Sequence, residues 1–199
     1  LHFALVQNES LQLNMGGTGG RITWPPVKLS TAGGGPDHTH VSAHVAITGE
    51  MVNISDVYDA VGFNFEGTRY FDSETKYRSK SMLVVPMRNH DNDIIGVLQL
   101  LNAKDPKSGQ IITFSEKAQT LAMSLASQAA VALTNNMLIN DLESLLDAFI
   151  KTIATAIDEK SPYTGGHVRR VADLTMMIAG KINAATQGPF AAVSFSREE

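Results

Sequence analysis

The sequence predicts an α+β fold: an antiparallel sheet flanked by helices, followed by one long helix. Residues 82–87 and 94–102 are rich in β-branched and aliphatic residues, and the polar segment 89–93 between them is typical of a hairpin turn. Residues 115–158 contain neither proline nor glycine, and apolar residues recur there at alternating steps of four and three. That spacing is typical of a helix that packs along a partner helix.

The remaining elements are shorter. A strand is expected over residues 1–7, and the Gly- and Pro-rich stretch 16–36 is expected to be loop with a short strand at 26–29. A helix over 40–48 should end at Gly49, since glycine accepts the left-handed conformation that closes helices. The other expected elements are a strand at 51–54, a short helical or turn segment at 56–61, one helical turn within 68–77, an edge strand at 111–114 and an amphipathic helix at 167–183.

Composition excludes several classes of function. The 199 residues, 43% hydrophobic and 18% charged, are ordinary for one or two globular domains, and the net charge of −4 gives no basic footprint for nucleic acid. No apolar run reaches the ~18 residues of a membrane span. The absence of cysteine excludes disulfides and thiolate sites and agrees with an expected cytoplasmic location. Both ends look cut, so we expect a fragment of a longer protein.

Three motifs in sequence order resemble a GAF domain. They are His-Val-Ala-Ile-Thr-Gly-Glu-Met-Val-Asn-Ile-Ser-Asp at 44–56, Tyr-Arg-Ser-Lys-Ser-Met-Leu-Val-Val-Pro-Met at 77–87, and Ile-Gly-Val-Leu-Gln-Leu-Leu-Asn at 95–102. The resemblance implies a small-molecule sensor whose antiparallel sheet helps to form a ligand pocket. It places an N-terminally truncated GAF domain at 1–114, with its last helix within 115–135.

The segment 71–79 is similar to the one that precedes the central strand in phosphodiesterase-type GAF domains, which bind cyclic nucleotides. By this resemblance Lys76 and Arg78 would face a phosphate, while Asp72 and Thr75 would orient a ribose or base. The alternative is structural: Asp72 caps the following turn, and Arg78 pairs with a surface carboxylate.

The motif Tyr-Thr-x-x-His-x-x-Arg-Val at 163–171 resembles the opening of HD and HD-GYP phosphohydrolase domains. The resemblance implies that residues 159–199 begin such a domain and that His167 is a ligand of a divalent metal in the intact parent. Further ligands would follow Glu199, so we expect no metal, no catalytic residue and no hydrolase activity in this chain.

Histidines in and after the glycine-rich loop are candidates for a second metal site. His38 and His40 lie beside Asp37, and His44 would share a helical face with His40. A metal site and ordinary solvated side chains are both compatible with this spacing, and the second alternative is preferred.

Residues 115–158 are expected to connect the two domains and to form a parallel homodimer. The seam includes polar Gln128 and Asn135, which would fix the register. In the first half of the helix the apolar face is wide, and residues on it would also cover the sheet: Leu121, Met123, Leu125, Ala129 and Ala130. The alternatives are a helix folded back on its own domain or broken near residues 135–136. The sequence as a whole is interpreted as a sensor fragment of a bacterial-type signalling phosphohydrolase, with a ligand-free dimerisation module as the alternative.

Overall fold

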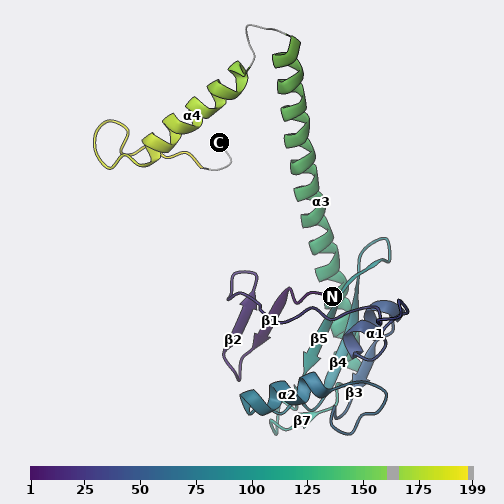
Figure 1. Ribbon diagram of the computed structural model, residues 1–199. Coiled ribbons are helices and arrows are strands. Elements are labelled where there is room, and N and C mark those ends of the chain that lie inside the picture. Colours follow the sequence, from purple (N-terminus) through teal and green to yellow (C-terminus); the bar gives the residue numbers. More distant parts are fainter. Residues whose placement is uncertain (161–165, 197–199) are drawn as a thin grey trace. The chain divides into compact units, whose positions relative to one another are not determined.

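A computed structural model describes residues 1–160 and 166–196 (Figure 1). The chain divides into two compact units, Leu1–Asn136 and Met137–Glu199. Helix α3 (Glu116–Lys160) is continuous through residues 135–136, so the alternative of a break there is wrong. None of the described helices is long and apolar enough to cross a membrane.

The first unit is built on an antiparallel sheet of order β3-β4-β5, with bounds Val52–Ile54, Met82–Arg88 and Ile94–Leu101. The expected hairpin is confirmed: Val84 lies opposite Gln99 on one side and opposite Val52 on the other. β4 is the central strand, and its residues 82–86 are buried. A strand that is buried on both faces requires apolar residues at every position, which explains the unbroken apolar sequence Met-Leu-Val-Val-Pro of residues 82–86.

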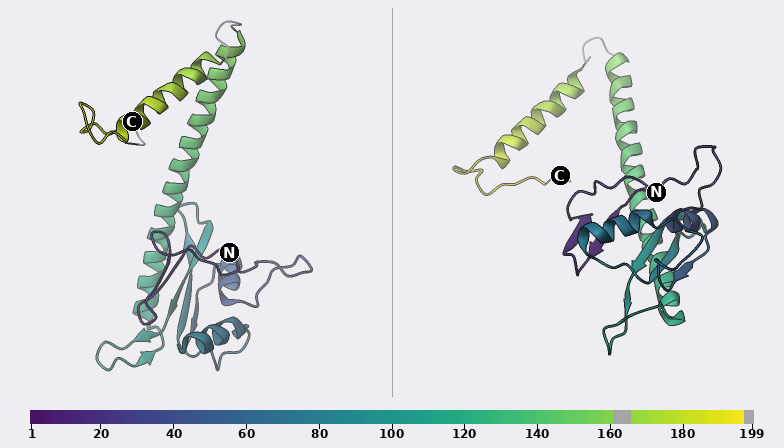
Figure 2. Two further views of the ribbon diagram at one scale, coloured as in Figure 1. Left: turned by 60° about the vertical axis from the view of Figure 1, so that its left-hand side comes forward. Right: turned by 60° about the horizontal axis from the view of Figure 1, so that its bottom comes forward.

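The two faces of β4 have different cores because successive side chains point to opposite sides of a sheet. Met82 and Val84 pack with Val41 and Val45 of α1 (Val41–Thr48). Leu83 and Val85 pack with Phe114 and with alanines of α3. The sheet therefore lies between α1 and the beginning of α3, as Figure 2 shows.

The residues of α3 that cover the sheet are not the expected leucines. Ala122, Ala126 and Ala130 are buried, whereas Leu121 and Leu125 are 60% and 51% exposed. Because each residue turns a helix by about 100°, the leucines lie roughly a quarter turn from the alanines. The small side chains let α3 approach the sheet closely. The prediction is wrong for Leu121, Met123, Leu125 and Ala129, which are exposed, whereas Ala130 is buried as expected.

Several short elements differ from expectation. β1 (Leu5–Asn8) pairs with the unexpected β2 (Leu13–Gly16), and no strand forms at 26–29. β6 (Ala103–Lys104) is also unexpected and pairs with β7 (Ile111–Ile112). The segment expected to hold one helical turn is the ten-residue helix α2 (Glu66–Thr75). Asn64 fixes the turn that leads into this helix, because its Oδ1 accepts a hydrogen bond from the Glu66 backbone N–H at 2.8 Å.

The end of α1 is fixed as predicted. Gly49 closes the helix at φ 71°, and its carbonyl accepts a hydrogen bond from Nη2 of Arg88 at 3.1 Å. A Cβ on Gly49 would lie 1.9 Å from that nitrogen, so a larger residue would displace the Arg88 guanidinium, and the left-handed conformation itself favours glycine. The second unit contains the rest of α3 and α4 (His167–Asn183), the expected second helix.

Candidate ligand-binding site

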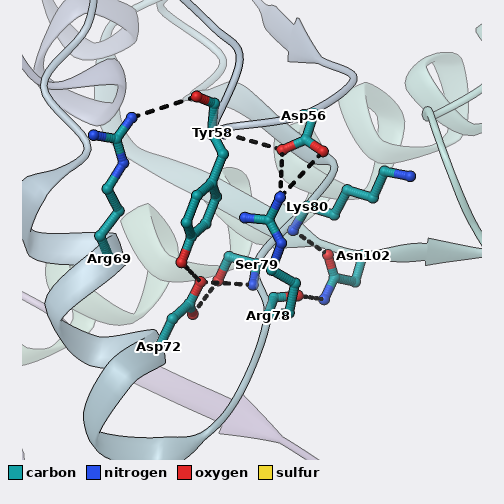
Figure 3. Close-up of polar contacts among 8 residues, drawn as sticks. All are labelled: Asp56, Tyr58, Arg69, Asp72, Arg78, Ser79, Lys80 and Asn102. Atoms are coloured by element: carbon teal, nitrogen blue, oxygen red, sulfur yellow. Dashed lines mark hydrogen bonds and ion pairs between the residues drawn. The ribbon is translucent and has the colours of Figure 1, made fainter.

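The candidate site joins α2, the segment 76–81 and the turn at 56–59. α2 ends at Thr75, and the next residue, Lys76, has a left-handed conformation with φ 54°. That conformation turns the chain out of the helix and toward β4, so residues 77–80 run back past the side chain of Asp72. Figure 3 shows the polar side chains that meet there.

Asp72 is the centre of this network and is 4% exposed. Its Oδ2 accepts hydrogen bonds from the Ser79 backbone N–H at 2.8 Å and from the Tyr58 hydroxyl at 3.0 Å. Its Oδ1 accepts from the Ser79 hydroxyl at 2.8 Å. A buried carboxylate with three donors is well compensated for the loss of water, so Asp72 ties α2 to both neighbouring segments.

Arg78 lies between a carboxylate and an aromatic ring. Its Nη2 is 3.3 and 3.4 Å from the two carboxylate oxygens of Asp56, and its guanidinium carbon is 3.4 Å from the centroid of the Tyr58 ring. Arg69 approaches the same ring, with 5.4 Å to the centroid, and Figure 3 shows Tyr58 between the two arginines. The Arg78 side chain is nevertheless 49% exposed, so it remains accessible to solvent.

Asn102 fixes the backbone of the same segment. Its Oδ1 accepts from the Lys80 backbone N–H at 2.7 Å, and its Nδ2 donates to the Arg78 carbonyl at 2.8 Å and to the Tyr77 hydroxyl at 2.9 Å. Asn102 itself has φ 58°, a conformation that asparagine tolerates better than most residues. The end of β5 therefore holds residues 77–80 in one conformation.

The four residues predicted to bind a ligand have different surroundings. Asp72 is enclosed by its three donors, and the hydroxyl of Thr75 donates to the Phe71 carbonyl within α2 at 2.7 Å. Lys76 is exposed, and its ammonium group makes no hydrogen bond or ion pair with the residues that the structure describes. Arg78 is half-exposed but paired. The cations of this stretch thus face solvent, while Asp72 and Thr75 face the protein.

Sequence reasoning missed Asp56, Tyr58, Ser79 and Asn102 as parts of the network. The turn at Asp56 could have been predicted locally, because an aspartate often accepts a hydrogen bond from the backbone N–H two residues later. Here the Tyr58 N–H donates to Asp56 Oδ1 at 2.9 Å. The pairing of Asp56 with Arg78 joins residues 22 apart in sequence and has no local signal.

His167 is the first residue of α4 and is exposed. Among the described residues, no three His, Cys, Asp or Glu side chains are grouped so that they could hold a metal ion. The preceding motif residues Tyr163 and Thr164 lie outside the described part of the chain. One histidine does not hold a catalytic metal, so the role of His167 in a longer parent stays a prediction.

Comparisons with known proteins find one family match and several partial relatives. The family model for the GAF domain matches residues 19–133. The dual 3',5'-cyclic-AMP and -GMP phosphodiesterase 11 of Drosophila melanogaster is 44% identical over 64 residues, which are 32% of this chain and 4% of that protein. The dual phosphodiesterase 11A of Takifugu rubripes is 40% identical over 73 residues, 37% of this chain and 7% of that protein.

A third relative, the cGMP-specific 3',5'-cyclic phosphodiesterase of Drosophila virilis, is 39% identical over 62 residues, 31% of this chain and 6% of that protein. The matched segments are thus a small part of each relative. Among solved structures, the type II free methionine-R-sulfoxide reductase of Thermoplasma acidophilum aligns with 52% of this chain and 63% of that chain, at 19% identity and a TM-score of 0.33.

Proposed function

Because the chain belongs to the GAF domain family, we propose that it is the regulatory part of a signalling protein and binds a small anionic ligand of the cyclic-nucleotide class. The observation that supports this most is the family match over residues 19–133, together with relatives that are named cyclic-nucleotide phosphodiesterases. The solvent-facing cations Lys76 and Arg78 supply the charge that a phosphate would require.

The ligand is tested by titrating the chain with cAMP and with cGMP while the melting temperature is measured. A ligand that binds only the folded state stabilises it by about 2.7 kcal/mol at one hundred times its dissociation constant. Lys76→Ala removes an exposed cation without breaking a described contact, so it should weaken binding and leave the unliganded melting temperature unchanged. Lys117→Ala is the matched control, because Lys117 is an exposed lysine of the first unit on α3.

A second candidate, a GAF module that binds no ligand, has one observation in its favour. Asp72 and Arg78 already have partners within the protein, which is the arrangement of structural residues. Absence of any shift with either nucleotide at millimolar concentration would support this module and exclude the ligand class proposed above.

We propose further that α3 pairs with the same helix of a second copy. Along the predicted seam the apolar side chains are exposed: 60% at Leu121, 65% at Leu142 and 60% at Phe149. Seven large seam residues together offer on the order of 700 Å² per helix, close to the ~800 Å² per partner of a standard interface. Those residues are Leu121, Leu125, Ile139, Leu142, Leu146, Phe149 and Ile153.

Pairing is tested by light scattering at micromolar concentration. The double variant L142E/L146E should be monomeric, because two carboxylates would face their copies across the seam. Met137→Glu is the control, since Met137 is 61% exposed but lies on another side of the helix from Leu142 and Leu146. A monomeric wild type would exclude the dimer.

The part that follows α3 is proposed to begin an HD-type phosphohydrolase domain, on the motif that ends at Val171. His167 would then be one metal ligand, with the others supplied by a longer parent. In that parent, His167→Ala should reduce the bound divalent metal and the hydrolysis of a phosphoester together, whereas full metal content in the variant would reject the assignment.

A further inference from the structure

We propose that His38 and His44 form a binding site for a divalent transition-metal ion of the copper, zinc and nickel group. His38 lies in the loop before α1 and His44 lies within α1. Their Nδ1 atoms are 3.1 Å apart, and their ring centroids are 5.1 Å apart. This site lies outside the candidate ligand-binding network, and its failure would leave the proposed sensor function untouched.

The backbone around the pair is held from several sides. Asp37 Oδ1 accepts hydrogen bonds from the Thr39 backbone at 2.9 Å and from the Thr39 hydroxyl at 2.6 Å. The Thr39 carbonyl accepts from the Asn64 backbone N–H at 2.7 Å, and the His44 ring packs edge to face on Phe63 with 5.4 Å between centroids. The two imidazoles are therefore brought together by structure that does not depend on their own contact.

The separation of the two nitrogens suits a shared ion. Nitrogens bound to one ion at about 2.0–2.1 Å stand about 2.9 Å apart at right angles and about 3.3 Å apart at the tetrahedral angle. The observed 3.1 Å lies between these values. In the neutral pair one Nδ1 donates its proton and the other accepts it, so the ion would replace one shared proton at the same place.

The charge around the pair also suits a cation. Asp37 is the residue directly before His38, so an acidic side chain lies near one of the two imidazoles. No lysine or arginine is among the described contacts of His38 or His44.

The donor set selects the class of metal. Two imidazole nitrogens suit copper, zinc and nickel, whereas magnesium and calcium require oxygen ligands. No third His, Cys, Asp or Glu completes a three-ligand group among the described residues, so water would fill the other positions. With two protein ligands, Cu²⁺ should bind most tightly by the general order of divalent-metal affinity.

Binding would fix the loop at 37–40 to α1. Phe63 packs against the core cluster that also contains Val45, one residue after His44. An ion held by His38 and His44 would therefore stabilise the packing of this loop and of α1 on the sheet. Because the ion binds only the folded state, the melting temperature would rise.

The test is isothermal titration of the 199-residue chain with CuCl₂, ZnCl₂ and NiCl₂, with MgCl₂ and CaCl₂ as negative controls. Wild type should bind one equivalent of Cu²⁺ at about 100 μM metal and should melt at a higher temperature with it. His38→Ala should weaken the affinity at least tenfold. His38 is exposed, so this variant should fold as wild type does, which the far-UV circular dichroism spectrum checks.

Two histidines serve as matched controls. His40→Ala changes the same segment outside the pair, and His90→Ala changes a hairpin histidine whose described partner is Asp91. Both variants should bind as wild type. The proposal is overturned if wild type binds no transition metal at that concentration, if His38→Ala binds as tightly as wild type, or if His40→Ala loses as much affinity as His38→Ala.

Discussion

Replacing Asp72 with alanine should lower the free energy of unfolding of the first unit more than any other single substitution in the candidate site. The substitution removes three hydrogen bonds and leaves the Ser79 N–H, the Ser79 hydroxyl and the Tyr58 hydroxyl without an acceptor. Ser79 is 1% exposed, so water does not replace the lost acceptor there. A buried donor left unpaired costs about 1–3 kcal/mol.

The expected loss is about 3–5 kcal/mol, below the full sum for three donors because the half-buried Tyr58 hydroxyl can turn toward solvent. That is a large part of the ~5–15 kcal/mol that stabilises a typical domain. Asp72→Asn keeps one acceptor oxygen but places an amide N–H₂ next to the donors. Its loss in free energy of unfolding should be about half that of Asp72→Ala.

Urea unfolding followed by tryptophan emission measures this loss. Trp24 is the one tryptophan of the sequence, and its ring lies 5.6 Å from that of Phe71, the neighbour of Asp72. With a slope of about 1.5 kcal/mol per molar urea, a loss of about 3 kcal/mol lowers the midpoint by about 2 M. Glu74→Ala is the control, because this exposed carboxylate of α2 has no described side-chain partner. A change below about 0.5 kcal/mol for Asp72→Ala would refute the assigned role.

Three further predictions concern other parts of the first unit. Gly49→Ala should lower the free energy of unfolding by more than about 1 kcal/mol, because alanine at φ 71° is strained and its Cβ displaces Arg88; Gly49→Asn should cost less in the same urea titration. Ala126→Leu, on the fully buried face of α3, should cost about 1–3 kcal/mol through overpacking, whereas Leu125→Ala on the exposed side should cost less. Hydrogen bonds from Ser108 and Lys107 lower the pKa of Asp105, so its stabilising contribution is present above the ordinary value of 3.8 and is lost as the pH falls through the lowered value. Asp105→Asn should therefore flatten the dependence of stability on pH below about 4, and an unchanged slope would contradict this.

The parts of the fold that sequence predicts well are those with local signals. The strands at β4 and β5 follow from aliphatic runs around a polar turn, and the end of α1 follows from Gly49. α2 is longer than expected from the sequence because its interior is polar and its N-cap position is occupied by Phe65, so neither apolar periodicity nor a capping residue marks its start. A wide apolar face of α3 is expected to cover the sheet, but close approach of the helix favours the alanines over the leucines, and apolar periodicity alone does not distinguish the two.

The candidate site was predictable only in part. Arg78 and Asp72 stood out as charged residues before a strand, and both belong to one network. Their partners Asp56 and Tyr58 come from a turn that is distant in sequence, so no local pattern pairs them. The meeting of His38 with His44 depends likewise on how the loop folds back onto α1. Helical spacing instead suggested His40 as the neighbour of His44.

The buried alanines and the exposed leucines of α3 lie on different sides of the helix. Ala122 and Ala126 hold the helix to the sheet, and Leu121 and Leu125 lie about 100° away. The leucines can therefore be substituted, in evolution or by design, without repacking the domain. If α3 pairs as proposed, matched charged residues at these positions would change the pairing preference and leave the interior of the domain unaltered.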